Sequence, residues 1–260
     1  MRRTKQIGVG WLFVGGLLLL LLCSCVSQPM DATREPIYFR VVAASSCDSI
    51  AQRLIAVYEE QPPQATIDLT VFNNAIASDR LRSGEADVAL LSWVGEEENA
   101  LWTAPFAEHE IAVVAHSDFP LQEVGLAVLH EVFRGQLQEW EGVALTPVSR
   151  EEGAGTRAVF ERMALGGGSV TLNAVVAASD EAVLEAVASR EGGIGYVSTC
   201  SLSDERLAGM RVVPVEGVLP KDEGYLLQAP LYLATVGEPA GNVRDFAQWV
   251  VSPAGRSVVE

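Results

Sequence analysis

The alternation of apolar and polar positions after residue 36 predicts strands and helices in turn. Residues 37–43 form a β-rich apolar run, and Ile50, Leu54, Val57 and Tyr58 then recur at helical spacing. This first part of the chain is predicted to hold strands at 37–43, 66–72 and 87–91 and helices at 50–58 and 75–82. That order favours an open α/β sheet with crossover connections.

The same pattern continues to the end of the chain. The unbroken apolar run 111–115 is typical of a strand covered on both faces, and Ser179 is typical of a helix N-cap. Further strands are predicted at 143–148, 194–197 and 230–235, and further helices at 128–133, 156–165, 179–187 and 243–250. No internal repeat interrupts this order, so the predicted fold class is α/β.

A different pattern precedes this body. Arg2, Arg3 and Lys5 lead into an almost unbroken apolar run, and residues 22–25 spell Leu-Cys-Ser-Cys. This pattern resembles the lipobox of bacterial lipoproteins, with Cys25 as the lipidated residue. We expect residues 1–24 to be a signal peptide and residues 25–36 a polar tether; the alternative is an uncleaved N-terminal anchor. Either places the body outside the cytoplasm.

Composition narrows the possible partners. The 260 residues are 49% hydrophobic and 20% charged, which is ordinary for a globular chain and excludes disorder. Asp and Glu number 34 against 18 Lys and Arg, for a net charge of -16. Because a nucleic-acid partner needs a clustered basic face, we expect none.

The segment 148–157, Val-Ser-Arg-Glu-Glu-Gly-Ala-Gly-Thr-Arg, carries the clearest chemical signal. It joins a predicted strand to a predicted helix, and Gly153 and Gly155 allow a tight turn that leaves helix-start N–H groups converging on one point. Arg150 can add a guanidinium and Thr156 a hydroxyl, so an anion site is predicted. It is not a Walker loop. The alternative is a glycine-rich turn with solvated charges.

Two other strand ends offer weaker candidates. Ser45 and Ser46 precede a predicted helix and can bind an anion or simply cap the helix, whereas Asp48 would repel a bound anion. Ser92 follows a predicted strand at its carboxyl end, where open α/β sheets bind ligands, although a single serine there is usually structural.

Signals for an enzyme or a metal are weak. Glu108, His109, Glu110 and His116 can be drawn as a metal cluster, but a strand would scatter them over both faces, so solvated histidines are favoured. No nucleophile elbow is present, and no cysteine has a catalytic histidine context. We expect no metal, cofactor or catalysis. A disulfide between Cys47 and Cys200 is open but disfavoured, because it would lock two predicted lobes.

Several blocks together resemble the phosphate-binding proteins of bacterial phosphate ABC importers, in the periplasmic-binding-protein-like superfamily. Residues 150–157 are similar to that family's Arg-x-x-Gly-Ser-Gly-Thr-Arg loop, and residues 44–47 loosely to its Gly-Ser-Thr-Thr loop. Further blocks in register are Gly84-Glu-Ala-Asp-Val88, Val132-Phe-Arg-Gly135 with Trp140, Gly193-Ile-Gly-Tyr-Val197, Pro230-Leu-Tyr-Leu233 and Ser252-Pro-Ala-Gly255. The resemblance covers nearly all of residues 37–260.

The resemblance implies a type II fold with a ligand cleft between two lobes, one of residues 37–110 plus 231–260 and one of residues 111–230. By position it implies a ligand set of Ser45, Ser46, Asn74, Ser92, Arg150, Gly155 and Thr156. Ala154 replaces a ligand serine, Trp93 stands where many relatives have arginine, and Asp48 adds a charge. Asp48 and Ala154 are therefore the candidates for setting selectivity, with Asp48 as acceptor of the phosphate proton.

The sequence thus predicts a membrane-tethered, extracytoplasmic solute-binding lipoprotein that captures phosphate or a similar tetrahedral oxyanion for an ABC permease. The alternative is an anion-sensing or partner-binding lipoprotein on the same fold without transport. A secreted phosphatase is a more distant alternative, since it would need metal-dependent turnover.

Overall fold

The structure is a computed structural model that describes residues 37–62, 64–95 and 100–259. The predicted signal peptide, Cys25 and the tether lie outside these residues. Residues 36–260 form one compact unit. Among the described residues, no helix combines the length and apolar character needed to cross a bilayer.

The first elements follow the predicted order closely. They are β1 (Ile37–Ala44), the short 3-10 helix η1 (Ser45–Cys47), α2 (Asp48–Glu59), β2 (Ala65–Phe72), α3 (Asn74–Arg82) and β3 (Val88–Leu91). Asn73 begins α3 by accepting a hydrogen bond from the N–H of Ile76 at 3.0 Å, which explains why the helix starts there.

The later elements are longer and more divided than predicted. They are β4 (Leu101–His116), α4 (Leu126–Phe133), β5 (Glu139–Trp140), β6 (Val143–Ala144), β7 (Thr146–Arg150), α5 (Gly155–Ala164), β8 (Val175–Ala177), α6 (Asp180–Ala188), β9 (Gly193–Ser198), η3 (Thr199–Ser201), η4 (Asp204–Leu207), β10 (Met210–Val212), β11 (Gln228–Val236), α7 (Gly241–Val251) and α8 (Pro253–Val259).

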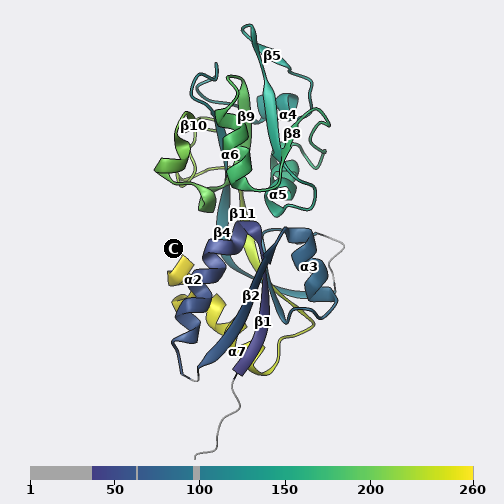
Figure 1. Ribbon diagram of the computed structural model, residues 1–260, viewed down its shortest axis with the longest axis vertical. Helices are drawn as coiled ribbons and strands as arrows, with labels where there is room; N and C mark the ends of the chain where they lie inside the picture. Colours follow the sequence, from purple (N-terminus) through teal and green to yellow (C-terminus); the bar gives the residue numbers. More distant parts are fainter. Residues whose placement is uncertain (1–36, 63, 96–99, 260) are drawn as a thin grey trace, which may run out of the picture. The chain divides into compact units, whose positions relative to one another are not determined.

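One hydrogen-bonded sheet runs through the described residues in the order β2-β1-β3-β11-β4-β9-β7-β8, with β10 also on β4. β1 pairs in parallel with β2 and β3, and β7 pairs in parallel with β8 and β9. The antiparallel strands β4 and β11 join these two parallel groups. Figure 1 shows β4 and β11 running between them.

Buried apolar side chains form separate cores on either side of these connecting strands. One half holds β1–β3, α2, α3, α7 and α8, with Leu54, Leu90 and Phe246 fully buried. The other half holds α4–α6 and β7–β9, with Phe133, Phe160 and Tyr196 in ring contact. We call these the first half and the second half. β4 contributes Phe106 to one core and Ile111 to the other, so it belongs to both.

Two predicted strands differ from the structure. The apolar run 111–115 is only the end of β4, because residues 101–110 pair with β11 although they carry polar residues. The predicted strand 143–148 splits into β6 and β7, where β6 pairs with β5 in a separate hairpin. In both cases pairing between distant segments decided the outcome, which local pattern does not encode.

Candidate functional site

The start of α5 meets the ends of β3 and α3 across the two halves. A side-chain carbon at Gly155 would lie 2.0 Å from Oγ of Ser92 and 3.0 Å from Oδ1 of Asn74. Nearby, the N–H of Ala75 donates to the carbonyl of Gly153 at 3.0 Å. Of the predicted ligand residues, Asn74, Ser92 and Gly155 therefore lie together, and position 155 admits no side chain.

The N-terminus of α5 is buried, and its first donors have no acceptor within the described part of the chain. Its N-cap, Ala154, has no side-chain oxygen, and no hydrogen bond among the described residues uses the N–H groups of Gly155 or Thr156. The hydroxyl of Thr156, a residue only 1% exposed, likewise has no partner there. Because buried polar groups are normally paired, these donors are suited to a bound anion.

The loop after β3 is held by Asn74, the first residue of α3. Its Oδ1 accepts from the N–H groups of Ser92 at 3.0 Å and Trp93 at 3.1 Å, and its Nδ2 donates to the carbonyl of Trp93 at 2.9 Å. Ser46 and Ser92 are joined through their hydroxyl groups at 2.7 Å. Asn74 thus fixes the loop that presents Ser92.

Arg150, at the end of β7, is 1% exposed and surrounded by acceptors. Its Nε and Nη2 donate to the two carboxylate oxygens of Glu151 at 3.0 and 3.1 Å, and its Nη1 donates to Asp180. Nη2 also approaches Oγ of Ser45 at 3.4 Å. Burial lowers the pKa of Arg150, but Glu151 and Asp180 outweigh that effect and raise it above its usual value.

Asp180 is a member of this site that sequence reasoning missed. It is 4% exposed, and its Oδ2 accepts from the N–H of Ser198 at 3.1 Å and the hydroxyl of Ser201 at 2.7 Å. The only local signal was an acidic residue after the N-cap Ser179, a pattern that equally describes an ordinary helix start. Contact with Arg150 depends on the parallel pairing of β7 and β8, which brings Arg150 opposite Ala177.

Ser45 and Asp48 lie at the outer side of this cluster. Both line a groove of about 340 Å³, which Glu181, Arg206 and the η3 segment bound on the other side. Asp48 is partly exposed and accepts from Nε2 of Gln52 at 2.8 Å. No hydrogen bond or ion pair joins Asp48 to Gly155, Thr156 or Ala154 among the described residues.

Histidine 109 differs from the prediction of a solvated side chain. It is 2% exposed on β4, with Nδ1 3.5 Å from Oγ of Ser198 and no hydrogen-bond partner on Nε2 within the described chain. Burial lowers its pKa to about 4, although the backbone of Ser92 acts in the opposite direction. The prediction was wrong because His109 lies within the long strand β4, where it pairs with Ala229 of β11, rather than at a strand end.

The remaining candidates are possible metal ligands and the two cysteines of the described chain. No group of three or more His, Cys, Asp or Glu residues capable of holding a metal ion occurs in the described ranges. Cys47, which is buried, and Cys200, which is exposed, are both free thiols. Burial raises the pKa of the Cys47 thiol, as expected for an unreactive cysteine.

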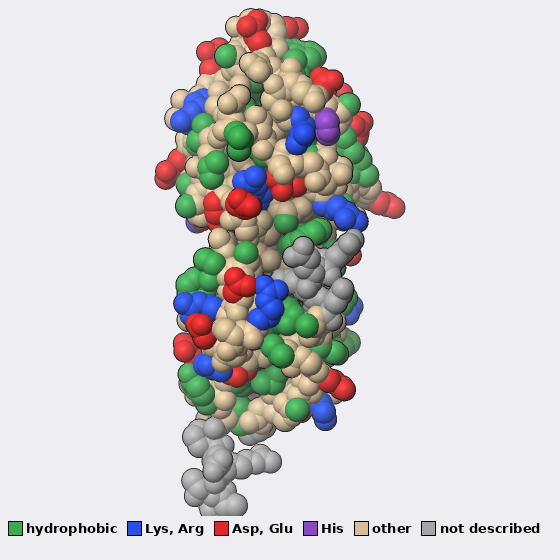
Figure 2. Space-filling model, turned by 90° about the vertical axis from the view of Figure 1, so that its right-hand side faces the viewer, with side chains coloured by type: hydrophobic (Ala, Val, Ile, Leu, Met, Phe, Trp, Pro, Cys, Tyr) green, Lys and Arg blue, Asp and Glu red, His purple; other side chains and the backbone are tan. Residues whose placement is uncertain are grey.

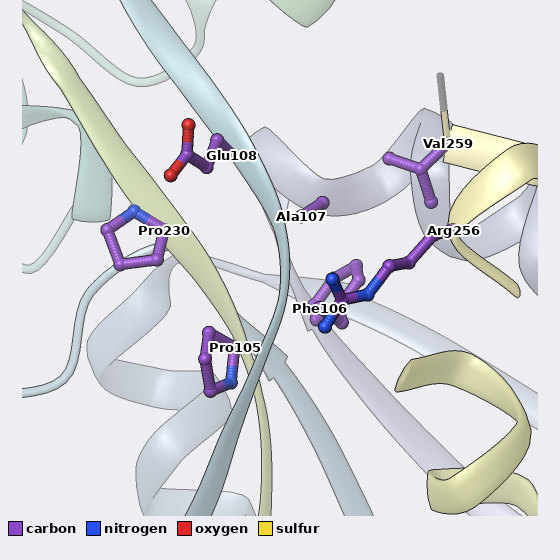
Figure 3. Close-up of a pocket in the computed structure, with 7 residues that line it drawn as sticks. All are labelled: Pro105, Phe106, Ala107, Glu108, Pro230, Arg256 and Val259. Atoms are coloured by element: carbon purple, nitrogen blue, oxygen red, sulfur yellow. The ribbon is translucent and has the colours of Figure 1, made fainter. Parts of the chain in front are cut away.

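A cavity of about 520 Å³ lies elsewhere, between the connecting strands and α8 (Figure 3). Pro105, Glu108 and Pro230 line it on the strands, and Arg256 extends into it from α8. None of the predicted ligand residues reaches it. On the face in Figure 2, Lys and Arg side chains lie scattered among acidic ones, without a continuous basic surface among the residues drawn in colour.

Comparisons with known proteins test the fold. A family model described as a PBP superfamily domain matches residues 31–254. The phosphate-binding protein PstS of Bacillus subtilis is 22% identical over 210 residues, covering 75% of this chain and 69% of that protein. A putative phosphate ABC transporter substrate-binding protein from Clostridium perfringens, solved with bound phosphate, matches with a TM-score of 0.76 at 20% identity, covering 85% of this chain and 96% of that one.

Regulators share the fold as well. The RuBisCO operon transcriptional regulator of Allochromatium vinosum is 29% identical over 194 residues, covering 72% of this chain and 59% of the regulator. The similarities to PstS and to regulators are both distant, and the superfamily is one of binding proteins that are typically not enzymes. The predicted periplasmic-binding-protein-like α/β fold is therefore confirmed, and the chain belongs to the PBP superfamily.

Proposed function

We propose that this chain binds inorganic phosphate or a similar tetrahedral oxyanion at the start of α5 and delivers it to an ABC permease. The single observation that carries the proposal is the buried start of α5, where Gly155 and Thr156 keep N–H groups and a hydroxyl without partners among the described residues. Such converging donors at the positive end of a helix bind anions.

Arg150 adds no excess of positive charge at this site. Asp180 and Glu151 together carry more negative charge than the guanidinium carries positive charge. The proposed site therefore binds through N–H and hydroxyl dipoles rather than through an excess of cations, which is compatible with the chain's net charge of -16. Ser45, Ser46, Asn74 and Ser92 complete the proposed site from the first half.

We place the lobe boundaries as the family resemblance implies, with residues 37–110 plus 231–260 in one lobe and residues 111–230 in the other. Separate apolar cores on the two sides of β4 and β11 support this division. Ligand binding between the lobes requires no bond to be made or broken, so we propose no enzymatic activity and no cofactor.

The binding test is calorimetry with phosphate on Thr156→Val. We expect affinity to fall about tenfold or more, as for loss of one hydrogen bond to a charged group, without loss of stability, because the hydroxyl has no partner in the protein. Thr235→Val is the matched control, since Thr235 is buried on β11 and donates to the carbonyl of Gly237 at 2.7 Å. Unchanged affinity in Thr156→Val would contradict the proposed site.

We further propose that Cys25 carries a lipid anchor that holds the protein at the outer face of the bacterial cell membrane. The Leu-Cys-Ser-Cys pattern supports this, and two acyl chains give stable attachment. Cys25→Ser is expected to leave the protein unprocessed or released. If the Cys25→Ser variant still fractionates with membranes at the mature mass, the proposed lipid anchor is wrong.

A second candidate function is anion sensing without transport, which the similarity to transcriptional regulators favours. Both functions use the same site. A permease encoded beside the gene, together with loss of phosphate uptake on deletion, favours transport; normal uptake in the deletion strain favours sensing.

A further inference from the structure

A hydroxyl-rich groove lies directly beside the proposed anion site. Its volume is about 340 Å³, within the usual range of small-molecule sites, and its walls come from both halves. Ser45, Ser46 and Ser49 line one side, and Ser201 and Ser203 line the other. Hydroxyl groups can both donate and accept, so this lining is suited to a neutral polyhydroxylated group.

Three contacts connect the groove to the anion site. The hydroxyl of Ser46 lies 2.7 Å from that of Ser92, which abuts Gly155. Ser45 lies 3.4 Å from Nη2 of Arg150. On the opposite wall, Ser201 donates to Asp180, the partner of Arg150. The groove therefore adjoins the side chains that surround the start of α5.

The number of donors at the anion site also favours a ligand that extends into the groove. Asn74 accepts from the N–H groups of Ser92 and Trp93, and Glu151 and Asp180 occupy most of the Arg150 guanidinium. A fully dehydrated inorganic phosphate presents four oxygens that need donors. A phosphate monoester presents three terminal oxygens, and its bridging oxygen leads to the rest of the molecule.

The charged residues that line the groove limit which chemical groups the ligand can carry beside its phosphate. Arg206 is paired with Glu181 at 2.7 Å, whereas Asp48 faces the groove bonded only to the uncharged Gln52 among the described residues. The groove thus has a net negative charge. It disfavours a second anionic group, such as a bisphosphate or a carboxylate, and the serine hydroxyl groups that line it can hydrogen-bond a neutral hydroxylated body.

We propose that the preferred ligand is a small phosphate monoester of a polyhydroxy compound, with its phosphate at the start of α5 and its hydroxyl groups in the groove. This inference rests on the proposed anion site and specifies its substrate class.

The test is calorimetry with inorganic phosphate, glycerol 3-phosphate and glycerol on the wild-type protein and on Ser49→Trp and Ser203→Trp. Both serines are exposed in the groove and form no hydrogen bond with Arg150 or Thr156 among the described residues, so each tryptophan is expected to occupy the groove and to leave the donors at the start of α5 in place. Ser189→Trp, on the exposed end of α6 outside the groove, is the matched control.

We expect glycerol 3-phosphate to bind at least about tenfold more tightly than phosphate, and the groove variants to remove that advantage while phosphate affinity changes less than about threefold. Ser189→Trp leaves both affinities unchanged. If phosphate binds and the ester does not, or if the ester keeps its advantage in both groove variants, the inference is wrong and the anion site stands. If neither anion binds, the proposed function fails as well.

Discussion

The starts of α5 and α6, both in the second half of the molecule, differ in how their first-turn N–H groups are paired. Both helices follow a strand of the same sheet, and both have first-turn N–H groups that need acceptors. In α6 the hydroxyl of Ser179 accepts from the N–H of Ala182 at 3.1 Å, and Asp180 and Glu181 add negative charge. In α5 the N-cap Ala154 offers no side-chain acceptor, and no acidic residue lies in the first turn.

The difference shows how neighbouring residues decide whether a helix start is structural or available. At the start of α6, the N-cap residue Ser179 supplies the hydrogen-bond acceptor. The first acidic residue, Asp180, forms an ion pair with Arg150. The start of α5 keeps its donors and is pressed against Ser92 and Asn74 of the other half. When a helix start has no side-chain acceptor of its own, its first N–H groups are available to bind an anionic ligand.

The largest expected effect comes from comparing the stability of variants at the two acidic residues that begin α6, Asp180 and Glu181. Asp180→Ala leaves Arg150 buried with one counter-charge fewer and frees the polar groups of Ser198 and Ser201, so we expect a loss of about 3 to 5 kcal/mol in the free energy of unfolding. Glu181→Ala removes an exposed pair with Arg206 and one negative charge from the helix start, and is expected to cost about 1 kcal/mol or less. Urea unfolding of both variants measures this, and equal costs would contradict the buried role of Asp180.

His109 lies between the two regions, near Ser198 on the α6 side and Ser92 on the α5 side, and gives a pH test. Its pKa in the folded protein is about 4, below the value of about 6.5 in an unfolded chain, so the unfolded state binds a proton first as the pH falls. The stability that this neutral histidine contributes is complete above pH ~6.5 and is lost between pH ~6.5 and ~4, on the order of 3 kcal/mol.

His109→Gln keeps a polar side chain but does not titrate. We expect the difference between its unfolding free energies at pH 7 and pH 4.5 to be smaller than that of the wild type. His116→Gln, on the partly exposed end of β4, is the matched control and is expected to behave like the wild type. If all three proteins lose stability equally with acid, His109 is not the buried neutral group described above.

The close approach of Gly155 to Ser92 predicts that a side chain at position 155 weakens phosphate binding. As a free energy, this effect is expected to be somewhat smaller than the losses of stability described above. In Gly155→Ala the new carbon meets Ser92 at 2.0 Å, so the two halves cannot close as they do here, and we expect phosphate affinity to fall at least about thirtyfold. Gly95→Ala is the control, because its added carbon has only an ordinary contact of 3.6 Å with Trp93. Calorimetry with full affinity in Gly155→Ala would show that α5 does not close onto the ligand.

The smallest expected effect concerns the cap of α6. Ser179→Ala is expected to cost about 1 kcal/mol of stability and to leave phosphate affinity unchanged, the reverse of the result expected for Thr156→Val. Chemical unfolding and calorimetry on the same two variants measure both quantities. If Ser179→Ala weakens binding as much as Thr156→Val does, the two helix starts do not differ in role.

Local pattern was sufficient for most of the elements in this protein. The boundaries of β1, α2, β2, α3 and β9 differ from their predicted ranges by about two residues or less, because strand alternation, helical spacing and the breakers at 62–63 and 192–193 act over a few residues. The glycines at 153 and 155 and the N-cap Ser179 were likewise recognisable from neighbours in the chain.

The tertiary structure decided what lies far apart in the sequence. The length of β4 depends on its pairing with β11, and the burial of His109 depends on the same sheet. The contact of Asp180 with Arg150, 30 residues away, follows from the register of β7 with β8. The sequence by itself determined which residues could bind an anion; only the fold determined which of their donors are already used, because hydrogen-bond partners are chosen among groups that the chain brings together from distant positions.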